Sequence, residues 1–417
     1  MFENWVTRGY DRMRLESSVL CAELLVFAEA LHSQGYRPRT LRRYLFAAEA
    51  FGRWISRRRW LIHDIDERRL QRFLAGCRRQ RCRGRGCGRF STVVFGVRKF
   101  VETMRTRGVM SGPCARSLTP NEKIVREFDA HLAHTGNSVR GTRQIYSRYA
   151  YELLETRFGT EEPDFRLLDA SCVSEFVRSK VAGLGQSSRR APATATRAFL
   201  RFLVERGLVA DGLLGAIPSV RQYKQASLPR YLSSKQLTAV LAACRIATPT
   251  GRRNLAMVLM LARLAVRACE VASLRLNDIR WRQGVVVIHA AKSRRERTLP
   301  LPSDVGAAIV AYLRHGRPHC QCPEVFLSVR APHRPLTPAA VGTVVAQALR
   351  RTGVTLARPG AHILRHTAAT QMVRAGASFK QVADVLGHAR IETTTIYAKL
   401  DLETLARITL PWPEVQP

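Results

Sequence analysis

The front half of the chain contains two segments that resemble each other at a spacing of about one hundred residues. The first copy contains Phe27, Leu31, Gly35, Tyr44, Phe73, Arg98, Phe100 and Gly108, and the second contains Phe128, Leu132, Gly136, Tyr146, Phe176, Arg197, Phe199 and Gly207. The offset stays between 99 and 103 residues, which indicates two copies of one module. Apolar residues recur at helical spacing, so each copy is predicted to be a bundle of four or five helices. Chance similarity between two basic helical segments is the alternative.

Linkers with proline and glycine follow each copy, over residues 111–120 and 218–229. We therefore predict three domains: a helical module over 1–112, a second helical module over 121–216, and a third domain over 230–417. The second linker is basic, which suits a strap along a DNA backbone, although many interdomain linkers have the same composition.

The charge of the chain favours a polyanionic partner. Its 68 Lys and Arg residues exceed its 32 Asp and Glu residues by 36. Basic surface gains affinity for nucleic acid by releasing the counterions condensed on it. Only 8 of the basic residues are Lys; the excess of Arg favours bidentate phosphate contacts, or it reflects a GC-rich genome. Hydrophobic residues make up 46% of the chain, which is typical of globular domains and argues against wholesale disorder.

Membrane insertion and secretion are not indicated. No apolar run reaches the roughly 18 residues that a membrane-spanning helix needs. The first residues lack the hydrophobic segment of a secretion signal. We therefore expect a soluble protein of the cytoplasm that associates with the nucleoid.

The ten cysteines are expected to be reduced thiols, because no export signal accompanies them. One cluster allows a metal site as the weaker alternative to an exposed loop: Cys77, Cys82, Cys87 and Cys114. A second group, Cys320 and Cys322 beside His319, is more simply a surface turn.

The back half reads as a separate domain with its own helices and a hairpin. A capping box at Ser233 predicts a helix start. The more hydrophobic helix over 255–264 is expected at the centre of the core. Two apolar runs, 285–288 and 298–301, flank a polar turn that contains Lys292, which predicts a β-hairpin.

Polar side chains recur near the end of this domain. His362 and Arg365 lie three residues apart at a predicted helix start, so both project from one face. Gly387 ends a predicted short helix, which places His388 just beyond its C-terminus. Tyr397 follows nine residues later, on another predicted short helix.

This order of residues is similar to the catalytic set of the tyrosine recombinases, the phage-integrase family, and especially to its Xer-like members. The matching residues are Arg267, Lys292, His362, Arg365, His388 and Tyr397. The resemblance covers roughly residues 230 to 400 and includes Leu-Gly-His at 386–388. It implies a mainly α fold: tandem helical core-binding-like domains, then an α+β catalytic domain with a small β-hairpin or sheet. The second module occupies the place of the family's core-binding (SAM-like) domain, and the first is an addition, either a second arm on DNA or a protein–protein module.

The resemblance also implies a site-specific recombinase or integrase that cleaves and rejoins DNA through a covalent 3′-phosphotyrosine at Tyr397. Arg267 and Arg365 would bind the nonbridging phosphate oxygens, and His388 would be a further donor. Lys292 would be the general acid for the 5′-hydroxyl. His362 would be the base or a proton relay. No metal or other cofactor is implied, because two Arg and one Lys supply the positive charge.

The implied partners are double-stranded DNA, a homotetramer on two synapsed sites joined through a Holliday junction, and, in some relatives, partner recombinases acting in series. In relatives a tail after the nucleophile docks on the neighbouring protomer. Here Leu405, Ile408 and Leu410 provide apolar side chains for such a contact.

Several residues depart from the family's pattern or invite other interpretations. The hairpin turn lacks the glycines common in relatives, and position 363 is Ile where an acidic residue is common. His289 and His366 are interpreted as structural or surface histidines. Glu270 is interpreted as a residue that holds the phosphate-binding arginines in position, by pairing or capping, without taking part in the chemistry. The alternatives to a recombinase are a type IB topoisomerase, which would relax plasmid of any sequence, and a catalytically silent DNA-binding factor of a mobile element.

Overall fold

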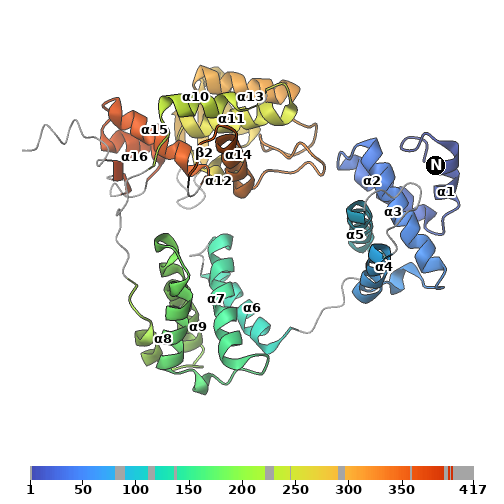
Figure 1. Cartoon of the computed structure of the whole chain (residues 1–417), viewed down its shortest axis with the longest axis horizontal. Coiled ribbons are helices and arrows are strands. Elements are labelled where there is room, and N and C mark those ends of the chain that lie inside the picture. Colours follow the sequence, from blue (N-terminus) through green and yellow to red (C-terminus); the bar gives the residue numbers. More distant parts are fainter. Residues whose placement is uncertain are drawn as a thin grey trace, which may run out of the picture. The chain divides into compact units, whose positions relative to one another are not determined.

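The computed structural model describes residues 2–79, 90–110, 118–135, 139–220, 230–244, 246–289, 296–356, 359–388, 393–394 and 396–397. Helices dominate and one small antiparallel sheet is present, which confirms the predicted fold class (Figure 1). Residues Ala115–Ala226 form one compact unit, and Met1–Cys114 with Ser227–Pro417 form the other. Within the described ranges, no helix is both long enough and apolar enough to cross a membrane.

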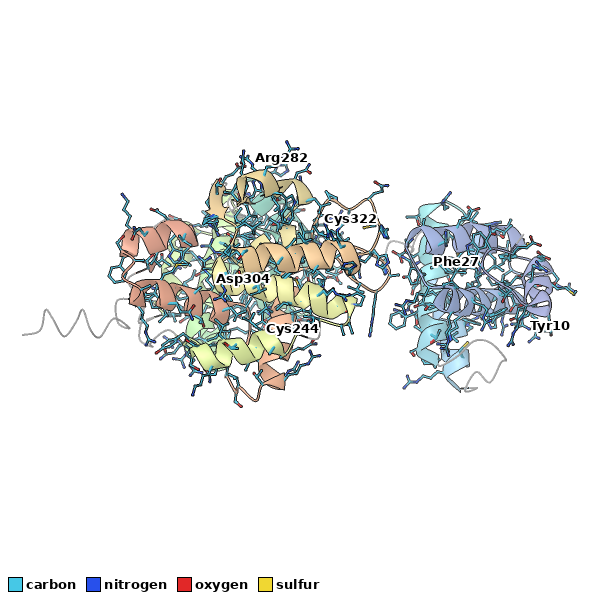
Figure 2. The ribbon with its side chains drawn as sticks, turned by 90° about the horizontal axis from the view of Figure 1, so that it is seen from above. Tyr10, Phe27, Cys244, Arg282, Asp304 and Cys322 are labelled. Carbon is cyan, nitrogen blue, oxygen red and sulfur yellow. The ribbon has the colours of Figure 1, made fainter. Side chains whose placement is uncertain are left out.

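The first module is helical throughout its described residues. Its helices are α1 (Gly9–Glu16), α2 (Cys21–Ser33), α3 (Pro38–Ser56), α4 (Glu67–Arg79) and α5 (Phe90–Thr106). Apolar residues at helical spacing on α2, α3 and α5 face one another and make a continuous core. Phe27 is fully buried in that core, whereas Tyr10 of α1 is 78% exposed (Figure 2).

The second module, the unit over Ala115–Ala226, is built from α6 (Pro120–His134), α7 (Arg140–Phe158), α8 (Ala170–Ala182) and α9 (Arg190–Glu205). A capping box between Thr119 and Glu122 starts α6, and the Asp169 side chain caps α8. The apolar faces of the four helices enclose a single core.

The two modules share their helix order and one feature of their packing. Helices α3 and α7 both have 19 residues, and α4 and α8 both have 13. Phe27 meets Phe100 edge-on at 5.3 Å between ring centroids, and Phe128 meets Phe199 in the same way at 5.1 Å. These are the residues that the sequence offset pairs. The boundaries 1–112, 121–216 and 230–417 themselves stay a prediction.

The last region contains seven described helices and three strands. They are α10 (Ser234–Ala242), α11 (Pro249–Arg263), α12 (Ala268–Ser273), β1 (Ile279–Arg280), β2 (Val285–His289), β3 (Glu296–Pro300), α13 (Ser303–His315), α14 (Pro338–Arg351), α15 (His362–Arg374) and α16 (Phe379–Leu386). Residues 256–262 of helix α11 are all buried in the core, as its hydrophobic run predicts.

The sheet is antiparallel in the order β1-β2-β3. Its hairpin pairs Val285 with Pro300 and His289 with Glu296, as the two apolar runs predict. The short strand β1 was not predicted, because two residues carry no periodicity. Ser233 caps α10 through a capping box with Gln236, also as predicted. Lys292, which the sequence places between β2 and β3, lies outside the described residues.

Candidate active site

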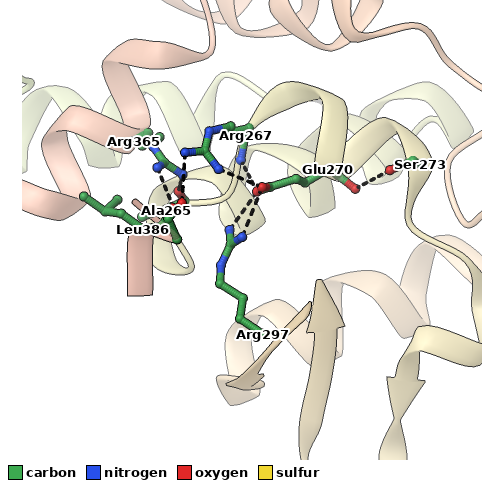
Figure 3. A network of polar contacts seen from close by, with 8 residues as sticks. Ala265, Arg267, Glu270, Ser273, Arg297, Arg365 and Leu386 are labelled. Carbon is green, nitrogen blue, oxygen red and sulfur yellow. Dashed lines mark hydrogen bonds and ion pairs between the residues drawn. The ribbon is translucent and has the colours of Figure 1, made fainter. Parts of the chain in front are cut away.

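Arg365 is the most deeply buried guanidinium of the candidate site. It lies in the first turn of α15 and is 5% exposed. Its Nη1 donates a hydrogen bond to the carbonyl oxygen of Ala265 at 2.6 Å, and its Nη2 donates to that of Leu386 at 2.7 Å (Figure 3). Ala265 has a φ of 51°, which costs a non-glycine residue about 1–2 kcal/mol. The strained turn after α11 thus presents one of the two carbonyl groups that fix Arg365.

Glu270 joins two further arginines to the site. Arg267 precedes α12, and its backbone N–H and its Nη1 donate to the Glu270 carboxylate at 2.8 and 3.0 Å. Arg297 of β3 donates to the same carboxylate through both Nη atoms, at 3.1 and 2.7 Å (Figure 3). Glu270 is 3% exposed. One buried carboxylate therefore accepts four hydrogen bonds and ties the hairpin to the start of α12.

The C-terminus of α16 closes the other side of the site. Gly387 takes a φ of 62° there, and its carbonyl oxygen accepts a hydrogen bond from Arg267 Nη2 at 3.3 Å. Carbonyl groups at a helix C-terminus carry partial negative charge and favour cations. A Cβ atom at position 387 would lie 2.8 Å from Arg297 Nη1, so glycine fits both the backbone turn and the close guanidinium.

The charges of this cluster are arranged to favour an anion. Burial alone raises the pKa of Glu270, but hydrogen bonds from Arg297 and from the Arg267 backbone outweigh it and hold that pKa below its usual range. Burial, and then the nearby Arg267, lower the pKa of Arg365 to about 10, so it stays protonated at neutral pH. Two guanidinium groups share one carboxylate and a third, that of Arg365, is bound by carbonyl groups, which leaves an excess of positive charge.

Arg267, Glu270, Arg297 and Arg365 are together called the clamp. Two of the predicted histidines border it. His388 follows Gly387, and its Nδ1 lies 2.8 Å from Thr394 Oγ1. Burial, and then Arg365 and Arg267, lower the pKa of His388 to about 4, so its ring is neutral at neutral pH. His362 is the first residue of α15; partial desolvation of its ring and the same two arginines lower its pKa below the ordinary value.

Tyr397 lies in a small apolar cluster next to the clamp. It is 2% exposed and packs with Ala265, Ala368, Ala369, Val373, Val382 and Leu386. Its hydroxyl oxygen lies 2.8 Å from Nδ1 of His366, which follows Arg365 on α15. Burial raises the pKa of the phenol, and the charge of Arg365 lowers it in part. The nucleophile candidate is thus within electrostatic range of the clamp.

The structure brings together four of the six residues that the sequence singled out. Arg267 and Arg365 bind adjacent carbonyl groups at the end of α16, immediately before His388. Tyr397 joins them through α15. His362 lies one turn from His366, with 6.4 Å between the ring centroids, and among the described residues the hydrogen bond to the phenol is made by His366. The sixth residue, Lys292, lies outside the described residues.

Sequence reasoning missed two residues of this network. Sequence reasoning assigns Arg297 to the polar turn of the hairpin, whereas the structure places it in β3, where it bonds Glu270. His366 was interpreted as structural or surface, yet its ring contacts the phenol hydroxyl. Its spacing of four residues from His362 placed both on one helix face. His289 is a surface histidine as expected, bonded to Asp278 and Glu296.

The cysteine groups give no metal centre within the described part of the chain, where no cluster of three or more His, Cys, Asp or Glu could hold an ion. Cys77 is buried in the core of the first module. Cys82, Cys87 and Cys114 lie outside the described residues. Cys320 and Cys322 are free thiols.

Comparison with known proteins gives consistent similarities. Residues 230–403 match the sequence pattern of the Phage integrase family. The chain is 33% identical over 393 residues to y4rA of Sinorhizobium fredii, named as an integrase/recombinase, covering 94% of each chain. It is 30% identical over 220 residues to the tyrosine recombinase XerC of Bacillus licheniformis, covering 51% of this chain and 70% of that one.

The fold is also similar to that of a solved structure. The XerH site-specific recombinase, solved with a palindromic difH substrate in a post-cleavage complex, matches 68% of this chain and 84% of its own. The TM-score is 0.54 at 19% sequence identity, so this likeness concerns the fold alone.

Proposed function

This chain belongs to the phage integrase family of tyrosine recombinases, and on that premise we propose that it cleaves and rejoins duplex DNA through a covalent 3′-phosphotyrosine at Tyr397. One observation carries the proposal. Arg365 and His366 are consecutive residues of α15. Arg365 is part of the clamp, and His366 contacts the phenol hydroxyl group of Tyr397. A phosphate bound to the guanidinium groups is thereby kept next to the nucleophile, as an in-line attack requires.

The clamp acts on the charge of the phosphate. Arg267 keeps about a third of its side chain exposed while Glu270 holds it, so it can meet a nonbridging oxygen. Arg365, which two carbonyl groups hold in position, binds a nonbridging oxygen of the same phosphate. Because these donors are positioned before the substrate arrives, they stabilise the charge that develops on the phosphorane without reorganisation. This supports a reaction that uses no metal ion.

The remaining roles concern protons and further donors. With Thr394 donating to its Nδ1, neutral His388 presents Nε2–H as a hydrogen-bond donor to the phosphate. Lys292, at the hairpin turn, protonates the departing 5′-oxygen. His362, exposed at the start of α15, exchanges protons with solvent.

The tandem modules support a role on DNA. Residues 1–112 contain 24 Lys and Arg against 10 Asp and Glu, a net charge of +14. The equivalent residues 121–216 contain 14 against 12, a net charge of +2. The first module therefore contacts DNA phosphates independently of the DNA sequence, and the second binds the DNA around the cleavage site.

Replacing the exposed Arg57 and Arg59 by Gln tests the contact made by the first module. The slope of log affinity against log salt concentration should become shallower by about 0.9 per residue replaced. An unchanged slope would contradict this contact.

Recombination itself requires two sites. We propose that four copies of the chain synapse two duplexes and pass through a Holliday junction, with the tail over 401–417 docking on the neighbouring protomer. Deleting that tail should impair synapsis more than binding to a single site.

The experiment that tests the function traps the intermediate. A library of duplexes with random sequence, nicked so that the cleaved strand loses its 5′-end, is incubated with the full chain, and covalent adducts are isolated on denaturing gels. We expect an adduct at Tyr397 that Tyr397→Phe abolishes. No adduct, or relaxation of plasmid without sequence preference, would contradict a site-specific recombinase.

The general acid has its own test within the same assay. A substrate with a 5′-thiol leaving group needs no proton, so it should restore cleavage by Lys292→Ala. Absence of this rescue would exclude Lys292 from the role.

A further inference from the structure

The hydroxyl group of Tyr397 has a specific partner that the family's catalytic set does not include. Its Oη lies 2.8 Å from Nδ1 of His366, with 5.7 Å between the ring centroids. The phenol is 2% exposed and lies among small apolar side chains, so water has little access to its proton. A proton leaving Tyr397 therefore has to pass to a protein group.

His366 can accept that proton in its resting state. Burial of the ring, then His362 and Arg365, lower the pKa of His366 below its ordinary value, so the imidazole is neutral. With the hydrogen on Nε2, the lone pair of Nδ1 accepts the hydrogen bond from the phenol. His388 also faces this region, because a charge on His366 lowers the pKa of His388, so the two rings disfavour being protonated together.

Binding of substrate reverses that electrostatic condition. A phosphodiester held by Arg267 and Arg365 brings a negative charge next to α15. This charge offsets the guanidinium groups, so a protonated imidazole becomes easier to form. The acceptor thus gains basicity when a phosphate is in place, which limits ionisation of the phenol in the free protein.

We propose that His366 is a further catalytic residue, the proton acceptor of the nucleophile; the proposal rests on the function proposed above. As Oη of Tyr397 bonds to phosphorus, its O–H bond breaks and the proton moves to Nδ1 of His366. The bond from phosphorus to the 5′-oxygen breaks, and that oxygen takes a proton from the general acid. In rejoining, the 5′-hydroxyl attacks phosphorus and gives its proton back to the general acid, the bond from phosphorus to Oη of Tyr397 breaks, and His366 returns its proton to the phenolate.

The choice of His366 over His362 follows from geometry. Both rings project from α15, but the hydrogen bond to Oη is made by His366. His362 lies a turn earlier and is exposed, which suits exchange of protons with solvent and not contact with a buried phenol. His362 is thus a second step for the proton.

The test separates proton transfer from positioning. In His366→Asn the side-chain oxygen takes the place of Nδ1 and accepts the hydrogen bond, but it cannot take the proton. Single-turnover adduct formation should fall about 10²–10³-fold, the scale of general base catalysis, with DNA affinity unchanged. The matched control is His289→Asn, an exposed histidine that bonds Asp278 and Glu296, and we expect it to cleave like the unaltered chain.

A more acidic nucleophile provides the rescue. Replacing Tyr397 by 3-fluorotyrosine lowers the pKa of the phenol, so less help is needed to remove its proton. In His366→Asn this change should raise the rate at least tenfold, and in the unaltered chain by less than threefold. Equal effects in both proteins, or cleavage by His366→Asn within threefold of the unaltered chain, would overturn the proposal.

A second measurement covers the case in which His366→Asn does not fold. In the chain with native His366, the pH–rate profile of adduct formation should keep its lower limb when 3-fluorotyrosine replaces Tyr397, because an imidazole sets it. A limb that moves with the acidity of the phenol would overturn the proposal. Normal adducts with His366→Asn would refute this inference and leave the recombinase function intact, whereas the absence of adducts in the unaltered chain would refute that function.

Discussion

On the clamp side of the site, formed by Arg267, Glu270, Arg297 and Arg365, each guanidinium group binds backbone carbonyl oxygens or one buried carboxylate. On the side of the proposed nucleophile, formed by Tyr397, His366, His388 and Thr394, the described side-chain contacts are apolar packing, ring contacts and two hydrogen bonds between side chains. The clamp is thus fixed before substrate arrives, as electrostatic stabilisation of a transition state requires. The proposed nucleophile, Tyr397, is held by contacts that a small movement can exchange, as an attack on phosphorus would require.

The two sides meet in shared elements. The Ala265 carbonyl group fixes Arg365, while its side chain packs in the cluster of Tyr397. Helix α15 contributes both Arg365 and His366. A change in one side therefore reaches the other over a short path, and the following variants test how independent the two sides are.

The largest effect is expected from Glu270→Gln. The amide cannot accept all four hydrogen bonds or balance two guanidinium groups, so Arg267 loses its fixed position. Single-turnover cleavage should fall about 10²–10³-fold, and the free energy of unfolding by about 3–5 kcal/mol, as for a broken buried ion pair. The control is Glu102→Gln, an exposed partner of Lys99, which should leave both quantities unchanged. A cleavage rate within threefold of the unaltered chain would show that the clamp does not depend on this carboxylate.

Arg297→Lys should have an intermediate effect. Lysine provides a point charge but cannot bind both carboxylate oxygens in the planar geometry of a guanidinium group. We expect cleavage to fall about 10- to 30-fold with DNA affinity retained, because the defect lies in the position of Arg267. Arg263→Lys is the matched control, since its pair with Asp304 is exposed. A loss of affinity in place of rate would assign Arg297 to DNA binding.

The pH dependence of stability probes the nucleophile side. The pKa of His388 in the folded chain is about 4, below the ordinary value of 6.5. Between these values the unfolded chain binds a proton that the folded chain does not. Stability should therefore be complete above about pH 7 and fall as the pH decreases to 4, by on the order of 2 kcal/mol after the full shift is discounted for the solvent that still reaches this half-buried ring. Thermal unfolding across this range should show a flatter profile for His388→Asn; an identical profile would contradict the low pKa.

The smallest effect is expected from Thr394→Val. The change removes the hydroxyl group beside Nδ1 of His388 and leaves the volume nearly unchanged. Without this hydroxyl group, no hydrogen bond at Nδ1 fixes which ring nitrogen of His388 carries the hydrogen. Cleavage should therefore fall about 3- to 10-fold. Thr393→Val, at the exposed neighbouring position, should have no effect. If Thr394→Val reduced cleavage as strongly as Glu270→Gln, the nucleophile side would be as rigid as the clamp.

Much of the fold could be predicted from local patterns. The capping box at Ser233, the apolar run of α11 and the two halves of the hairpin each depend on neighbouring residues, and each is present. The end of α16 at Gly387 followed from the preference of glycine for positive φ. The strand β1 could not be predicted, because its pairing with β2, and not its own two-residue sequence, defines it.

The candidate site was less accessible to sequence reasoning. Motif order pointed to Arg267, Arg365, His388 and Tyr397, and these lie together. The same reasoning overlooked Arg297, because the bond between β3 and Glu270 joins residues 27 positions apart. It also gives His362 the role of base or proton relay, which stays a prediction, while the described hydrogen bond to the phenol is made by His366.

By itself, the sequence determined the helical modules and their duplication, the excess of positive charge, and the family with its order of reactive side chains. The helices and the charge follow from periodicity and composition, and the family follows from the resemblance of its motifs; all of these can be read along the chain without knowing which distant segments pack together. The tertiary structure decided which side chains share a carboxylate, which carbonyl groups fix each guanidinium group, and which histidine meets the phenol. Such pairings depend on distances and directions between segments that are remote along the chain, so packing alone could select them.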